Sequence, residues 1–392
     1  MPKKIIMVLA SLSFLQSCVS DRGTDANTWI RLTEIPQIGG LAMPECYIDG
    51  DEIFIHGGII DKQEFSPLNS ESAILNLSTN TWRHVSRNSA PKPKTMQVIA
   101  GFQNEILIFG GHDEKEDFSS DAYLYHIEKD SWIRLDASRL DPRTRHRLIT
   151  IGDKAIVFGG EGAKEGLNWG YYDFSNKQWQ VFQPQPSSGN RIHFVAERLA
   201  GELFVWGGFI GNKKTAKGFL LNPESQTFTA LPEKGAPSPR SNAKSVSFGD
   251  RVLIWGGASS ESHANSGAVF DKETFSWKTL PPIPDQQFQT LTNPSLTRVD
   301  DRFALLWGGR FGFKNFNTDA WLFDLEAWKW HRLHLKNPPS GRMLHCMIPI
   351  SADELLVFGG FGQDEKGFIH YRDTYRIKIA NPNHRIFHFF RW

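Results

Sequence analysis

Short apolar runs recur along the chain at nearly constant spacing, and each of them ends in a pair of glycines. Seven such runs occur, and the first glycine of each pair follows that of the preceding pair by 48 to 53 residues. They cover residues 53–58, 106–111, 155–160, 203–208, 252–257, 304–309 and 355–360. Apolar runs this short are typical of strands buried on both faces, and paired glycines allow a sharp change of backbone direction after them. The pattern predicts seven copies of one β-unit.

A turn followed by an aromatic residue forms a second landmark in most of these units. A polar residue is followed six positions later by an aromatic one. The pairs are Asn76 and Trp82, His126 and Trp132, Asp173 and Trp179, Asn222 and Phe228, Asp271 and Trp277, and Asp324 and Trp330. The residues between them are typical of hairpin turns. A further short strand precedes each glycine pair, so each unit supplies four antiparallel strands in about 50 residues.

Because the glycine pair and the aromatic residue recur in phase, the units resemble kelch repeats. The resemblance covers residues 28–379 and implies an all-β fold, a seven-bladed β-propeller with four-stranded antiparallel blades. We expect residues 28–380 to form the propeller, residues 18–27 to be a tether and residues 381–392 to be a C-terminal tail.

The first and last units predict how the ring closes. Residues 27–32 resemble the Trp-containing outer strands at residues 80–85 and 130–135, yet no blade precedes them. The seventh unit, residues 342–379, has three inner strands and no clear Trp strand after them. We therefore predict that the N-terminal strand pairs into the last blade, which removes an exposed sheet edge. The alternative is that residues 384–390 in the tail form this strand.

The N-terminus has the features of an export signal. Two lysines precede an apolar stretch at residues 5–15, which is too short to span a bilayer. Residues 15–18 resemble a bacterial lipobox, in which the cysteine is lipidated after cleavage. The resemblance implies a signal peptide at residues 1–17, lipidation of Cys18 and, because Val19 follows, attachment to the outer membrane on its periplasmic or surface face. The alternative is an ordinary signal peptide with a chance cysteine.

Two further cysteines, Cys46 and Cys346, lie 11 and 13 residues before the first glycine of their units. Both are therefore expected on innermost strands, in the first and seventh blades, which adjoin if the ring closes. Outside the cytoplasm such a pair can persist as a disulfide. Two buried free thiols are the alternative, since a reduced cysteine packs as a small apolar residue.

Five basic residues share a register with the glycine pairs. They lie 16 or 17 residues before the first glycine and are Lys94, Arg143, Arg191, Arg240 and Arg342. The first and sixth units have Leu41 and Thr292 at this position. One hypothesis is a broken ring of cations at one end of the channel, suited to a sialate, a uronate or a carboxylate-rich peptide. The alternative is a structural role, in which these side chains bond carbonyl groups of the adjacent blade's turn.

Two loops that follow glycine pairs carry other candidate chemistry. Residues 112–117 are acidic, but they lack the regular ligand spacing of a cation site, so a solvated loop is the preferred interpretation. Residues 310–316 place three phenylalanines among two cations, a pattern that suits recognition of a sugar or a protein partner. The alternative is that this loop folds back onto its own blade. No metal site and no cofactor are predicted.

The balance of charge argues against nucleic acid as a partner, because 44 Lys and Arg face 43 Asp and Glu in 392 residues. The chain also resembles two groups of kelch-type enzymes at the level of the ring. The copper site of galactose-oxidase-like proteins cannot be matched residue by residue. Bacterial N-acetylneuraminate epimerases act on an acidic sugar that would suit the basic register, yet no catalytic acid-base pair can be carried over.

We therefore predict a binding module for a protein or glycan, held at a bacterial membrane only through its lipid. An enzyme acting on an acidic sugar, similar to the epimerases, is the alternative. A carboxylate in contact with clustered arginines in a closed pocket would favour the enzyme.

Overall fold

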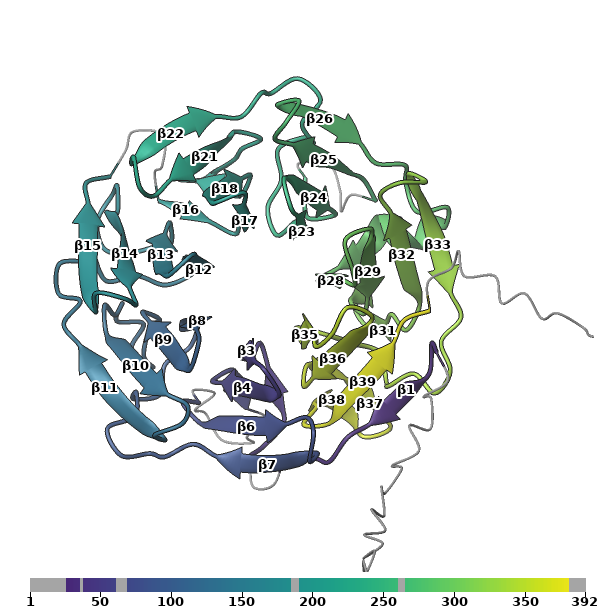
Figure 1. The fold of residues 1–392 in the computed structure, drawn as a ribbon. Coiled ribbons are helices and arrows are strands. Elements are labelled where there is room, and N and C mark those ends of the chain that lie inside the picture. The colour runs from purple at the N-terminus through teal and green to yellow at the C-terminus, as the bar shows by residue number, and fades with distance from the viewer. Residues whose placement is uncertain (1–25, 36–37, 61–68, 185–189, 260–264, 381–392) are drawn as a thin grey trace, which may run out of the picture.

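A computed structural model of the protein describes residues 26–35, 38–60, 69–184, 190–259 and 265–380. Within these residues, strands form seven four-stranded antiparallel sheets that surround a common axis as the blades of a propeller (Figure 1). The innermost strands of neighbouring blades contact one another around the ring. The predicted all-β, seven-bladed fold is confirmed.

The blades follow one another in chain order, each from the innermost to the outermost strand. The first contains β3 (Glu45–Asp49), β4 (Glu52–His56), β6 (Ser72–Asn76) and β7 (Thr81–His84), and the second β8 (Val98–Phe102), β9 (Glu105–Phe109), β10 (Ala122–His126) and β11 (Ser131–Leu135). The third contains β12 (Arg147–Ile151), β13 (Lys154–Phe158), β14 (Trp169–Asp173) and β15 (Gln178–Phe182), and the fourth β17 (Val195–Leu199), β18 (Glu202–Trp206), β21 (Gly218–Asn222) and β22 (Thr227–Ala230). The fifth contains β23 (Lys244–Phe248), β24 (Arg251–Trp255), β25 (Gly267–Asp271) and β26 (Ser276–Thr279), and the sixth β28 (Ser295–Arg298), β29 (Phe303–Trp307), β32 (Ala320–Asp324) and β33 (Lys329–Leu333).

Small sheets accompany four of the blades. They are β2 (Leu41–Ala42) with β5 (Ile59–Ile60), β16 (Arg191–Ile192) with β19 (Phe209–Ile210) and β20 (Lys213–Lys214), β27 (Leu291–Thr292) with β30 (Arg310–Phe311) and β31 (Asn315–Phe316), and β34 (Arg342–Met343) with β37 (Phe361–Asp364) and β38 (Gly367–His370). A short 3-10 helix, η1 (Gln286–Thr290), precedes the sixth blade. Each of β2, β16, β27 and β34 leads directly into the innermost strand of its blade.

The glycine pairs end the second strand of each blade. All fourteen of these glycines have a positive φ, a conformation that side chains with a Cβ rarely adopt. At Gly111, where φ is 88°, a Cβ atom would lie 2.7 Å from the carbonyl oxygen of Thr95. Glycine is therefore required both by the turn and by the close approach of the neighbouring chain.

The aromatic landmark explains how blades pack on one another. Trp132 on the outermost strand of the second blade lies 6.4 Å from the ring of Phe54 in the first blade, and its indole N–H donates to the carbonyl oxygen of Ser86 at 2.7 Å. Trp82, Trp277 and Trp330 donate in the same way, to Thr33, Pro232 and Pro281. Each of these indoles therefore fills apolar space and also satisfies its N–H against the preceding blade.

The seventh blade contains strands from both ends of the described chain. Its order is β35 (Cys346–Pro349), β36 (Glu354–Phe358), β39 (Thr374–Lys378) and β1 (Trp29–Arg31). Trp29 is paired with Ile377 across the ladder, and its ring lies 5.2 Å from that of Trp307 in the sixth blade. The N-terminal strand thus occupies the outer position that the sequence assigned to it. The alternative strand at residues 384–390 lies outside the described residues.

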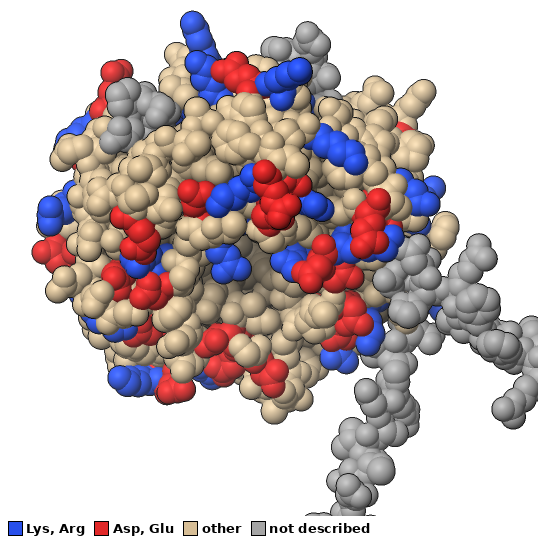
Figure 2. All heavy atoms as spheres, turned by 45° about the horizontal axis from the view of Figure 1, so that its top comes forward, with Lys and Arg blue, Asp and Glu red and all other residues tan. Residues whose placement is uncertain are grey.

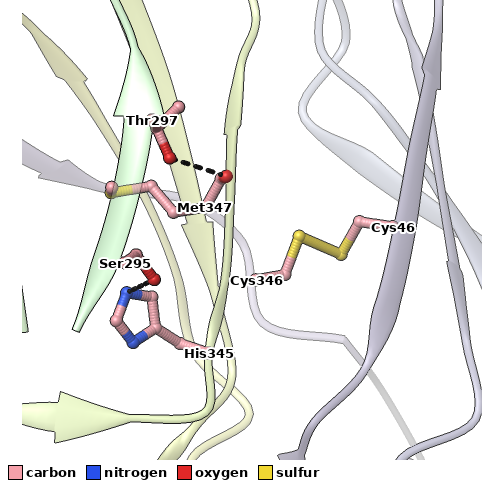
Figure 3. The surroundings of a disulfide bond; sticks show 6 residues. All are labelled: Cys46, Ser295, Thr297, His345, Cys346 and Met347. Atoms are coloured by element: carbon pink, nitrogen blue, oxygen red, sulfur yellow. Dashed lines mark hydrogen bonds between the residues drawn. A yellow bond between two sulfur atoms is a disulfide. The ribbon is translucent and has the colours of Figure 1, made fainter. Parts of the chain in front are cut away.

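A disulfide joins the first blade to the seventh. Cys46 on β3 and Cys346 on β35 face each other from adjacent innermost strands, with their Cα atoms 6.4 Å apart (Figure 3). His345 and Met347, on either side of Cys346, are tied by hydrogen bonds to Ser295 and Thr297 of the sixth blade. The innermost strand of the seventh blade is therefore linked to both of its neighbours.

The predicted signal peptide and Cys18 lie outside the described residues. Across the ranges that the structure describes, no helix has the length and apolar character needed to cross a membrane.

We expect loss of the disulfide to lower the unfolding temperature by roughly 5–10 °C. The bridge spans 300 residues of sequence, for which the chain-entropy model gives about 5–6 kcal/mol of stabilisation. Calorimetry of the oxidised protein, the reduced protein and a Cys46→Ser/Cys346→Ser variant measures this difference. The reductant should not affect the double variant, and equal unfolding temperatures for all samples would contradict the prediction.

Candidate functional site

The five basic residues of the register lie inside the blades. Four arginines each donate from Nη1 to the carbonyl oxygen of the first glycine of the pair in the same blade. The bonds are Arg143 to Gly159 at 3.2 Å, Arg191 to Gly207 at 2.8 Å, Arg240 to Gly256 at 3.1 Å and Arg342 to Gly359 at 3.0 Å. All four side chains are buried. Their contacts are those of structural residues, and the acceptor is in their own blade rather than in the adjacent one.

Two of the five basic side chains also form ion pairs. Lys94, also buried, pairs with Asp121 at 2.6 Å, and Arg342 pairs with Asp373. Burial lowers the pKa of Arg143 and Arg191 to about 10, which still leaves both charged at neutral pH. The structure therefore does not gather the register into an open ring of cations.

In the two blades that lack a basic residue at the register position, an asparagine donates to the carbonyl oxygen of the first glycine instead. Asn69 donates to the carbonyl oxygen of Gly57 at 3.3 Å, and Asn317 donates to that of Gly308 at 2.9 Å. Both asparagines are buried. In the first and sixth blades, an asparagine therefore makes the hydrogen bond that an arginine of the register makes in four other blades.

A different set of residues, two positions before the first residue of each innermost strand, lines the end of the channel. All seven have a left-handed backbone, with φ between 49° and 57°, and they are Met43, Met96, Arg145, His193, Asn242, Asn293 and Leu344. Each precedes the innermost strand of its blade, and together they line one cavity of about 230 Å³, here called the mouth cavity. Such a backbone is uncommon outside glycine. Figure 2 shows one face of the ring with a hollow at its centre and charges of both signs around it.

The mouth cavity has two chemically different walls. The cationic wall comes from the third and fifth blades and consists of Arg145, Arg147 and Lys244. His193 of the fourth blade lies in the same part of the cavity, and burial lowers its pKa, which favours the neutral ring. The apolar wall comes from the first, second and seventh blades and consists of Met43, Ile59, Met96, Val98 and Leu344. Glu45 is the acidic residue that lines the cavity. Of the register residues, Lys94 also lines the cavity, where it is paired with Asp121. The register identified the correct end of each blade, but most side chains at the mouth come from residues further along the chain.

Enclosure in the cavity shifts the titration of its charged groups. Removal from water raises the pKa of Glu45 to about 7, although the positive charge of Arg147 acts in the opposite direction. Removal from water also lowers the pKa of Lys244 to about 8, and Arg147 adds to this effect. Near neutral pH, Glu45 is therefore partly protonated while Lys244 remains mainly charged.

A buried amide adds a neutral donor to the cavity wall. Burial lowers the pKa of His56 to about 4, so its ring is neutral, and it is held between Ser72 at 2.8 Å and the Oε1 atom of Gln97 at 3.2 Å. The Nε2 atom of Gln97 is buried and has no hydrogen-bond partner in the described part of the chain. Gln97 lines the mouth cavity, so this amide is available to a ligand.

The arrangement that would favour an enzyme is not found among the described residues. Within them, no ion pair joins Glu45 to an arginine or lysine, and Arg145 pairs instead with Glu161 at 2.7 Å. No group of three His, Cys, Asp or Glu side chains in these ranges is placed to hold a metal ion. In the acidic loop, Asp113 accepts from the backbone N–H groups of Lys115 and Asp117, which closes a turn.

The chain matches the family model of the KLHDC2/KLHL20/DRC7 Kelch-repeats domain over residues 34–191 and 145–360. It therefore belongs to the kelch-repeat propellers, a family whose propeller domains generally bind proteins. It is 23% identical over 345 residues to Kelch domain-containing protein 2 of Bos taurus, covering 84% of this chain and 78% of that protein. It is 22% identical to Kelch domain-containing protein 1 of Homo sapiens over 331 residues, 81% of this chain and 74% of that protein. Acyl-CoA-binding domain-containing protein 4 of Arabidopsis thaliana is 24% identical over 253 residues, 59% of this chain and 36% of that protein.

Proposed function

We propose that the protein is an exported, lipid-anchored kelch propeller that binds a protein partner through an acidic group held in the mouth cavity. The observation that carries this proposal is the cationic wall. Arg147 and Lys244 line the cavity, and neither has an ion-pair partner among the described residues. Cations enclosed by protein attract a carboxylate more strongly than cations in open water.

The composition of the cavity determines what kind of group fits. Guanidinium groups bind carboxylates through paired hydrogen bonds, and Arg147 supplies one that is not already paired with a carboxylate of the described residues, whereas Arg145 is paired with Glu161. The free amide of Gln97 is a further donor, while the methionines of the opposite wall accommodate apolar parts of a partner. A protein segment with an acidic side chain next to apolar ones matches both walls.

Export and anchoring rest on the N-terminal sequence and on the disulfide. The lipobox-like residues 15–18 end in Cys18, ten residues before the start of the predicted propeller. The disulfide between Cys46 and Cys346 suits an oxidising compartment, because such bridges are rare in the cytoplasm. We propose the outer membrane as the site of attachment.

The anchor is tested by the substitution Cys18→Ser in the full-length protein. We expect the variant to lose metabolic labelling with an alkyne analogue of palmitate and to leave the membrane fraction. Membrane attachment that persists without label would contradict lipidation at this cysteine. The variant Cys46→Ser is the matched control and should keep its label.

Binding is tested with a fluorescent peptide that has an Asp-Glu-Asp core flanked by Gly-Ser, and with its Asn-Gln-Asn analogue. We expect the full-length protein in detergent to bind only the acidic peptide, and Arg147→Glu to weaken this binding at least tenfold in fluorescence anisotropy. Arg198→Glu is the control, because Arg198 is exposed near the far end of β17. Equal binding of both peptides, or full binding by Arg147→Glu, would contradict the proposal.

We expect the affinity for the acidic peptide in this assay to fall as the pH rises. Glu45 becomes negatively charged as the pH rises through about 7, and Lys244 loses its charge above about 8. The first change repels an acidic ligand and the second removes an attraction, so binding should weaken from pH 6 to pH 9, and Glu45→Gln should retain more of it at pH 8. If an oligogalacturonate binds at the cavity and no acidic peptide does, the partner is a glycan and the protein proposal is wrong.

A further inference from the structure

An exposed cluster of phenylalanines connects the sixth and seventh blades. Phe313 at the tip of the β30–β31 hairpin is 67% exposed, and Phe368 on β38 is 43% exposed. Their rings meet edge to face at 5.6 Å, and Phe368 stacks on Phe361 at 5.3 Å. Phe316 packs against Phe361 from the sixth blade at 5.9 Å. We call these four residues the phenylalanine ridge.

The sixth-blade hairpin that carries Phe313 is stabilised by contacts other than those of the phenylalanine ridge. The base of the sixth-blade hairpin is fixed by Asn317, which donates to the carbonyl oxygens of Gly308 and Asp319 at 2.9 and 3.0 Å. The strands β30 and β31 also pair directly with each other. The rings of Phe313 and Phe368 are therefore displayed on a scaffold that other contacts support.

The ridge lies on the same face as the mouth cavity. Its hairpins pair with β27 and β34, and the chain continues from these strands into Asn293 and Leu344 of the cavity wall. A second hollow of about 410 Å³ shares Asn242 and Asn293 with the mouth cavity and reaches Arg310 and Gly312 beside Phe313. The second hollow therefore lies between the mouth cavity and the hairpin that carries Phe313.

The charge beside this second hollow is positive. The guanidinium carbon of Arg310 lies 5.5 Å from the centre of the Phe313 ring, and its Nη1 donates to the carbonyl oxygen of Phe313. The Nε atom of Arg310 is buried without a hydrogen-bond partner in the described part of the chain. Arginine beside exposed aromatic rings is the composition of the energetically dominant part of protein interfaces.

We propose that the phenylalanine ridge docks an apolar side chain of the same protein segment whose acidic group occupies the mouth cavity. This inference rests on the proposed function and extends it from one contact to two. The rings already pack on one another, so little side-chain entropy is lost on binding. Two linked contacts also explain how a small cavity can select a partner, because the spacing between the contacts becomes part of the recognition.

The test uses a series of peptides in which an Asp-Glu-Asp core is joined to a Leu-Phe pair by Gly-Ser linkers of increasing length. We expect affinity for the wild-type protein to pass through a maximum with linker length and to exceed that of the core alone at least tenfold. Phe313→Ala/Phe368→Ala should remove this gain and leave the affinity for the core unchanged. Phe275→Ala is the matched control, because Phe275 is another exposed phenylalanine, in the turn between β25 and β26.

The outcomes separate the two proposals. A gain that the double alanine variant retains, or an affinity independent of linker length, overturns the ridge and leaves the acidic site in place. Failure of every peptide, including the core alone, overturns the proposed function and this extension together. Binding of the protein to phosphatidylglycerol vesicles that depends on Phe313 and Phe368, with no effect on peptides, assigns the ridge to a membrane surface and also overturns the proposal.

Discussion

In six of the seven blades, a buried side chain donates a hydrogen bond to the carbonyl oxygen of the first glycine in the pair, and the packing of the blade depends on this contact. The glycine is buried at the end of the second strand, where its left-handed backbone takes the carbonyl out of the sheet ladder. A buried carbonyl without a donor is costly, so each such position needs a partner. Arginine supplies it in four blades and asparagine in two, at distances of 2.8 to 3.3 Å. A guanidinium provides a charge-assisted bond and has further N–H groups for nearby carbonyls, as Arg191 shows with Lys217.

Because the glycine carbonyl needs a buried donor, the residues that support the ring differ from those that can contact a ligand. The arginine is held inside the blade, and the chain then turns through a left-handed residue before it enters the innermost strand. Arg143 and Arg145 illustrate the consequence, because the first is buried and bonded to Gly159 while the second lines the mouth cavity. The support repeats around the ring, whereas the residue at the mouth differs in chemistry from one half of the ring to the other.

The architecture could be predicted from the sequence because each blade has the same short pattern of residues. Glycine pairs and Trp positions define the blades, and the surplus Trp29 strand identifies the outer strand of the last one. The adjacency of Cys46 and Cys346 followed from counting back from their glycines. The residues of the mouth cavity were not predicted. In each blade one residue with a left-handed backbone points into the cavity, and its residue type differs from blade to blade, so no sequence pattern marks it. Asn69 and Asn317 were missed because they lie at different distances, 12 and 9 residues, from their glycines. Counting two residues beyond the register position would have found six of the seven mouth residues, and in the sixth blade Asn293 lies one residue beyond it.

The register arginines support the blades, whereas Arg145 and Arg147 face the mouth cavity. Labelling of the folded protein with phenylglyoxal, followed by peptide mass spectrometry, measures the exposure of each arginine separately. We expect rapid modification of Arg147 and Arg145, and protection of Arg143, Arg191, Arg240 and Arg342 until the protein is unfolded in urea. Modification of these four in the folded protein at the rate of Arg147 would show that they face solvent and do not support the blades.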